Sequence, residues 1–155
     1  MKNQLRTKIY NAAVLTFEEM GFMFPVTENE AEPPAGAPEA TVCVQFNGPF
    51  SGGLVIKAYG GLLAALAANM LGESDTPSEQ QQLDALGEVA NVICGNLLPS
   101  VAGTTEVFDL GTPSRAAEIE FAGGWASSTD VHIALDQGSA DVLFYIDGEV
   151  PALKE

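Results

Sequence analysis

The sequence predicts an α+β domain, in which a mainly antiparallel β-sheet carries an N-terminal helix and two longer helices on one face. Three observations lead to this prediction. The chain opens with helical periodicity, two β-like runs separated by a short turn follow, and two further helical segments precede a series of short β-like runs. At 155 residues the chain suits one domain with a single core, spanning residues 1–155.

The first elements follow in order along the chain. Residues 3–20 repeat apolar positions at helical spacing, and Gly21 is suited to cap the end of this helix. The segment 27–40 is rich in Pro, Glu and Ala, which predicts an exposed connection. The β-like runs 40–46 and 52–59 flank the turn NGPFS and therefore predict a hairpin.

A second helix is expected from about Gly61 to Leu71, with Gly72 ending it. After the third helix, Gly and Asp separate several short β-like runs, which predict a meander of strands. These runs are 105–110, 115–121, 130–136 and 141–147.

The third helix has clear boundary signals. Thr76 suits the N-cap, Pro77 the first helical position, and Glu79 the capping-box position. The helix should run to about Leu98, because Pro99 opposes its continuation.

Composition and charge disfavour several classes of partner. The chain carries 21 acidic and 6 basic residues, for a formal charge of −15. Nucleic acids and anionic membrane surfaces are bound by clustered Lys and Arg, which this chain lacks. The most apolar window spans roughly ten residues, too short to cross a bilayer, and the amphipathic N-terminal stretch indicates a helix rather than a signal peptide. We expect a cytoplasmic protein that binds neither nucleic acid nor membrane.

Few residues suit metal binding or nucleophilic catalysis. Cys43 and Cys94 lie in separate apolar runs without metal-ligand spacing, which predicts reduced core residues. His132 stands alone in an alternating strand and is expected to be structural or exposed rather than catalytic. A conventional hydrolase with a Ser or Cys nucleophile is therefore disfavoured.

A polar stripe on the third helix is the principal candidate site. Asp84, Glu88 and Asn91 are spaced i, i+4 and i+7, which places them within about 60° of one another around the helix. Apolar residues recur on the other side, at Leu83, Leu86, Ala90, Ile93 and Leu97. A surface helix normally presents polar residues to water without any function, so spacing alone leaves that interpretation open.

Two details favour a site on this stripe. Asn is a weak helix former, so Asn91 in mid-helix invites an explanation. Gly95 lies close to the stripe and costs about 1 kcal/mol relative to Ala in a helix interior. Its missing side chain would let another backbone approach closely.

These residues resemble the signature of the CheC, CheX and FliY family of bacterial chemotaxis phosphatases. That signature is Asp or Ser, three residues, Glu, two residues and Asn, followed after 21 residues by Pro. In this chain Asp84, Glu88 and Asn91 have that spacing, and Pro113 follows after 21 intervening residues. The stretches EVANVICGN, GPFSGGLVI and EEMGF also resemble the family. The N-terminal stretch NAAVLTFEEMGFMF lacks a second E-x-x-N, so the chain is closest to the single-site CheX type.

The resemblance implies a phosphatase that acts on the aspartyl phosphate of a CheY-like response regulator. Asn91 would insert into the regulator and orient the attacking water, and Glu88 would pair with the regulator's lysine. Asp84 and Pro113 would be supporting positions. No cofactor is expected in this chain, since the Mg²⁺ would belong to the regulator. The family also suggests a homodimer formed through the sheets.

Two alternatives remain open at this point. The first is a non-catalytic CheX-like binding or scaffold module in a two-component signalling pathway. The second, weaker one is a structural component of the flagellar switch.

Overall fold

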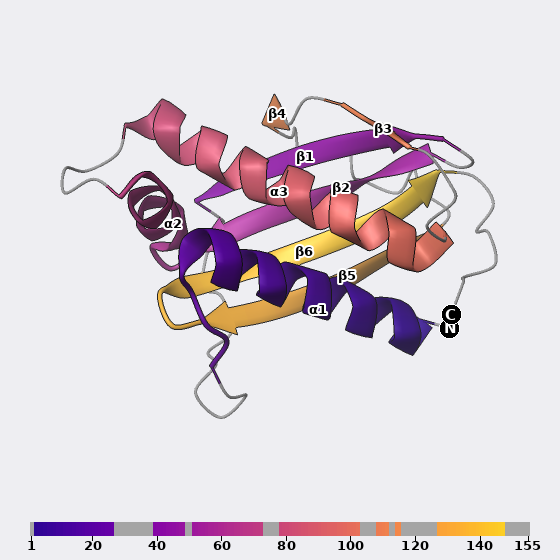
Figure 1. The fold of residues 1–155 in the computed structure, drawn as a ribbon, viewed down its shortest axis with the longest axis horizontal. Helices are drawn as coiled ribbons and strands as arrows, with labels where there is room; N and C mark the ends of the chain where they lie inside the picture. The colour runs from indigo at the N-terminus through magenta and orange to yellow at the C-terminus, as the bar shows by residue number, and fades with distance from the viewer. Residues whose placement is uncertain are drawn as a thin grey trace.

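The fold is taken from a computed structural model, which describes residues 2–26, 39–48, 51–72, 78–102, 108–111, 114–115 and 127–147. The elements in chain order are α1 (Lys2–Gly21), β1 (Ala40–Asn47), β2 (Ser51–Tyr59), α2 (Leu62–Leu71), α3 (Glu79–Ala102), β3 (Asp109–Leu110), β4 (Ser114–Arg115), β5 (Ser127–Leu135) and β6 (Gly138–Asp147) (Figure 1).

The described strands form one antiparallel sheet with the order β3-β1-β2-β6-β5, and β4 also pairs with β1. The β1–β2 hairpin is confirmed, and it lies in the middle of the sheet. The prediction of a meander is wrong, because the last four strands divide between the two sides of this hairpin. β3 and β4 pair with the free edge of β1, whereas β6 pairs along β2 from Ser51 to Tyr59.

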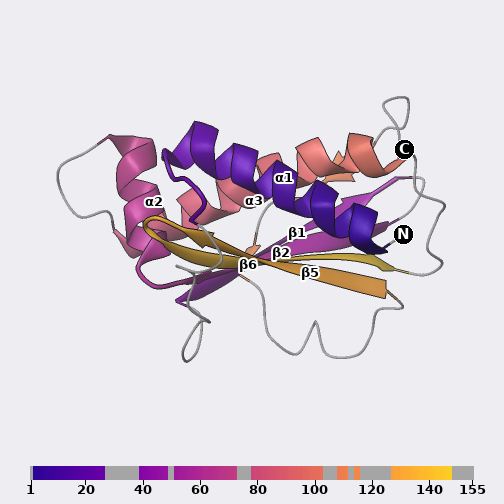
Figure 2. The same ribbon diagram turned by 90° about the horizontal axis from the view of Figure 1, so that it is seen from below.

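The three helices lie on the same side of the sheet, which Figure 2 shows in edge view. Along β1 the inward-facing Val42, Val44 and Phe46 are buried against them, as strand alternation requires. This confirms the predicted α+β class. The helix lengths differ from expectation, since α2 has 10 residues and only α3, with 24, is longer than the 20-residue α1.

Helix α3 begins two residues later than its sequence signals indicated. Gln81 donates its backbone N–H to Ser78 Oγ (3.1 Å), and Ser78 donates its backbone N–H to Gln81 Oε1 (2.8 Å). This is a capping box with Ser78 as the N-cap, so the assignment of Glu79 to the box is wrong. Thr76 and Pro77 lie outside the described residues.

The C-terminal end of α3 also differs from the prediction, because the helix continues through Pro99 to Ala102. Two side chains bond to backbone carbonyls near this end. Ser100 Oγ donates to the Leu97 carbonyl (2.9 Å), and Lys8 of α1 donates to the Ser100 carbonyl. A cationic donor at a helix C-terminus satisfies a carbonyl that has no intrahelical partner. The bond from Lys8 therefore stabilises the helical turn that follows Pro99.

Helix α2 is fixed at both ends. Glu39 Oε1 accepts hydrogen bonds from the backbone N–H groups of Gly61 (3.0 Å) and Leu63 (3.5 Å). A carboxylate at this position also complements the helix dipole. Gly72 ends the helix at φ 67, as predicted, and donates to the Ala68 carbonyl.

Gly21 was predicted to cap α1 and is the last residue of that helix, but it is not in the left-handed conformation. The residue in the left-handed conformation is Phe22, at φ 54. A Cβ on Gly21 would lie 2.7 Å from Leu66 Cδ1, and the Gly21 carbonyl accepts a bond from Asn69 Nδ2 (2.7 Å). The glycine therefore lets α2 approach the end of α1.

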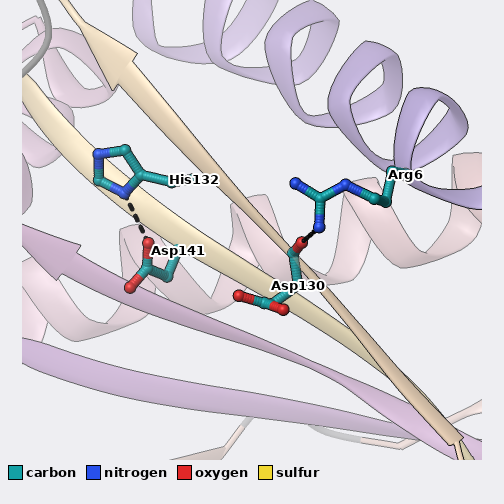
Figure 3. A network of polar contacts seen from close by, with 4 residues as sticks. All are labelled: Arg6, Asp130, His132 and Asp141. Atoms are coloured by element: carbon teal, nitrogen blue, oxygen red, sulfur yellow. Dashed lines mark hydrogen bonds and ion pairs between the residues drawn. The ribbon is translucent and has the colours of Figure 1, made fainter. Parts of the chain in front are cut away.

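The outer edge of β5 is partly occupied by the chain itself. Val26 donates to the Ala134 carbonyl (3.0 Å), and Asp136 donates to the Phe24 carbonyl (2.9 Å). Further along the strand, Arg6 Nη1 donates to the Asp130 carbonyl (2.6 Å) (Figure 3).

Among the described residues, no helix has the length and apolar character needed to cross a membrane. Cys43 and Cys94 are both buried and free, as predicted. Most of the connection predicted at 27–40 lies outside the described residues. Its last two residues are described: Glu39 is exposed, and Ala40 already belongs to β1.

Candidate functional site

The three stripe residues lie on the exposed side of α3. Asp84, Glu88 and Asn91 are all exposed, whereas Leu86 and Ile93 on the opposite side are fully buried in the core. Helical geometry spreads the three polar residues over about 10 Å along the axis and about 60° around it. The structure therefore brings them together as a narrow surface stripe.

The side chains of Glu88 and Asn91 have no hydrogen-bond or ion-pair partner among the described residues. Asp84 differs, because its Oδ1 accepts a bond from Gln80 Nε2 (2.8 Å) one turn earlier. This bond holds Asp84 towards the start of the helix. A carboxylate and a carboxamide that bond to no other described residue can offer their hydrogen-bonding groups to another molecule.

A surface pocket of about 200 Å³ adjoins the N-terminal half of the stripe. It is lined by Met70, Gln81, Asp84, Ala85 and Glu88. Sequence reasoning missed Met70 and Gln81, because Met70 comes from α2 and reaches the stripe only through the packing of α2 on α3. The pocket therefore combines two carboxylates with apolar side chains.

Gly95 continues the stripe beyond Asn91. Its helical angle is about 20° from that of Asp84, which places it between Glu88 and Asn91 around the helix. Gly95 is exposed, and a Cβ built on it would meet no other atom of the described structure within 4 Å. No packing or left-handed backbone among the described residues accounts for this glycine.

His132 is not part of the stripe. It lies on β5 between the buried Val131 and Ile133, so it faces away from the helices. Its Nδ1 lies 2.6 Å from Asp141 Oδ1 on the neighbouring strand (Figure 3). Burial, and then the charge and hydrogen bond of Asp141, raise the pKa of Tyr59 in the same region. This cross-strand pair fits the structural role expected for His132.

Pro113 lies outside the described residues, so its position relative to Asn91 is not part of the structure. Within the described ranges, no group of three His, Cys, Asp or Glu side chains is arranged to hold a metal ion.

Comparison with known proteins decides the family. The model of a family described as "Chemotaxis phosphatase CheX" matches residues 40–133, which is more than half of the chain. The chain belongs to the CheX family. The match includes both the hairpin and the whole of α3, so the family region contains the polar stripe.

Solved CheX structures share the same fold. The Vibrio vulnificus chemotaxis protein CheX has a TM-score of 0.72 and 18% identity, covering 95% of this chain and 99% of that one. CheX from Desulfovibrio desulfuricans has a TM-score of 0.70 and 17% identity, covering 93% and 99%. A complex of CheX, CheY, BeF₃ and Mg²⁺ from Borrelia burgdorferi matches with a TM-score of 0.68 and 17% identity, covering 92% and 97%. A search of curated proteins finds no sequence match.

Proposed function

We propose that this chain is a protein phosphatase that accelerates hydrolysis of the aspartyl phosphate on a CheY-like response regulator. The observation that carries the proposal is the exposed Glu88 and Asn91 pair, which has no side-chain partner among the described residues and lies on one face of α3 in a CheX-family chain. The Borrelia burgdorferi relative, which was solved with CheY, BeF₃ and Mg²⁺, supports the choice of partner.

The proposed chemistry consists of positioning. Phosphoryl transfer requires an attacking oxygen in line with the leaving oxygen, and little covalent work from the protein. The Asn91 carboxamide can both accept and donate hydrogen bonds, so it can hold a water in one orientation. Glu88, one turn earlier on the same face, would pair with a lysine of the regulator and fix the docking register. The Mg²⁺ is expected in the regulator, and none in this chain.

Asp84 and Pro113 are proposed as supporting positions. Asp84 lines the same pocket as Glu88, and its side chain is held by Gln80. Its carboxylate can therefore accept hydrogen bonds from donors at the rim of the regulator's active site. The proposal for Pro113 rests on the sequence spacing alone. A homodimer and a cytoplasmic location likewise rest on the resemblance and the sequence, and light scattering tests the former.

The test is an assay of acyl-phosphate loss from a phosphorylated, Mg²⁺-loaded response regulator of the same cell. We expect the wild-type chain to accelerate the loss and Asn91→Ala to lower the acceleration about a hundredfold, the size of effect seen when one positioned transition-state contact is removed. The matched control is Asn96→Ala, because Asn96 is exposed on the same helix but points about 140° away from Asn91.

The result also separates the alternatives. Equal rates for the wild type and Asn91→Ala with every candidate regulator would contradict the catalytic proposal. Binding of a regulator without any acceleration would instead favour the non-catalytic binding or scaffold module.

A further inference from the structure

We infer that the response regulator's backbone packs directly against α3 at Gly95, so that Gly95 is a specificity-determining position of the docking surface. This inference rests on the proposed function for the identity of the partner. It extends the binding surface by one helical turn beyond Asn91, towards the C-terminal end of α3.

Gly95 lies on the same exposed side of α3 as the stripe residues. Asp84, Glu88, Asn91 and Gly95 follow one another at intervals of four, three and four residues, which keeps all four on a single side of the helix. All four are exposed. A partner that receives Asn91 must therefore come close to residue 95, since the two positions are about 6 Å apart along the helix axis.

Neither packing nor backbone conformation within the described residues calls for a glycine at position 95. Gly21 and Gly138 each have a neighbouring atom at 2.7 Å from a built Cβ, so packing within the chain requires them. Gly95 has no atom of the described structure within 4 Å of that point, and its φ is not positive. Glycine nevertheless weakens a helix interior relative to alanine. A close contact supplied by another molecule accounts for this choice.

A competing explanation is that Gly95 eases the helix through Pro99, four residues later. The proline ring crowds the carbonyl of residue i−4, which is the carbonyl of Gly95. A change at the Cβ of residue 95 separates the two explanations. If Gly95 relieves strain at Pro99, alanine destabilises the fold, whereas if Gly95 serves docking, alanine stabilises it.

The experiment measures stability and binding on the same variants. Thermal unfolding gives Tm, and titration with a regulator loaded with beryllofluoride and Mg²⁺ gives Kd without requiring turnover. The variants are Gly95→Ala and the bulkier Gly95→Gln, with Asn96→Ala as a control that improves helix propensity at an exposed position away from the stripe.

We expect Gly95→Ala to raise Tm by about 2 to 4 °C and to raise Kd about tenfold, with a larger increase in Kd for Gly95→Gln. Asn96→Ala should raise Tm slightly and leave Kd unchanged. Wild-type affinity in Gly95→Ala, or a lower Tm in that variant, would overturn the inference. Binding by a wild-type chain that does not accelerate hydrolysis would remove the proposed catalytic function and leave this inference intact.

Discussion

Ser78 and Gln81 each donate a backbone N–H to the side-chain oxygen of the other, at 2.8 and 3.1 Å. The pair defines where α3 begins. Gln81 also lines the pocket that contains Asp84 and Glu88. Gln81 therefore takes part both in the cap of α3 and in the pocket beside the candidate site.

Ser78→Ala should lower stability by about 1 kcal/mol, because it removes the side-chain acceptor for an N-terminal N–H group of α3. For a chain of this size the loss corresponds to a fall in Tm of about 2 to 4 °C. Thermal unfolding followed by circular dichroism measures it. Ser78→Asp is the matched control, since Asp also caps helices and should keep Tm near the wild-type value. An unchanged Tm in Ser78→Ala would contradict the role of the box.

Glu88→Gln should weaken the regulator's binding about tenfold and reduce the salt dependence of binding, because it removes a charge that faces the partner. The measurement is Kd for the beryllofluoride-loaded regulator at low and high salt. Glu19→Gln provides the control, since Glu19 is an exposed acid on α1 and its loss changes the net charge equally. Equal effects of the two substitutions would mean that only net charge matters.

Gly138→Ala should be strongly destabilising, by about 2 to 3 kcal/mol. A Cβ there would lie 2.7 Å from Leu62 Cβ and 2.8 Å from its Cα and N, and φ is 142. These Leu62 atoms belong to the start of α2, and they cannot move aside as the end of a flexible side chain could. Gly72→Ala is the comparison, because φ is also positive but the space around it is open, so it should cost only about 1 kcal/mol. Denaturant unfolding that ranks the two variants equally would contradict this explanation.

Alkaline pH should destabilise the fold through Cys94. Burial, with a smaller contribution from Cys43, raises the pKa of the Cys94 thiol from 9.0 to about 12. The unfolded chain therefore loses this proton at lower pH than the folded chain does. The contribution to stability is complete below pH 9 and falls as pH rises towards 12. Denaturant unfolding of wild type and Cys94→Ala across this range should show a smaller decline in the variant.

The parts of the fold that were predicted correctly depend on local pattern. The first two helices and the central hairpin follow from periodicity and turn residues within a few positions of each other. The partition of the later strands depends on pairing between distant segments, which the pattern of β3 to β6 does not encode. The start of α3 was misplaced because Thr76 and Ser78 both suit an N-cap, and the reciprocal bonds between Ser78 and Gln81 place the cap at Ser78.

The candidate site likewise has features that follow from local sequence pattern and features that depend on tertiary packing. Spacing of i, i+4 and i+7 was sufficient to place Asp84, Glu88 and Asn91 on one exposed face. The pocket was not predictable, because Met70 reaches it through the packing of α2 on α3. The exposure of Gly95 to open space likewise depends on what the rest of the fold leaves uncovered.

The residues that follow α1 have a consequence for self-association. An exposed strand edge offers unpaired N–H and C=O groups to any other extended chain, and proteins commonly block such edges to avoid aggregation. Here Phe24 and Val26 already bond to the end of β5, and Arg6 occupies the Asp130 carbonyl. These bonds occupy part of the outer edge of β5 at both Asp130 and Ala134, and so hinder the addition of another strand along that edge.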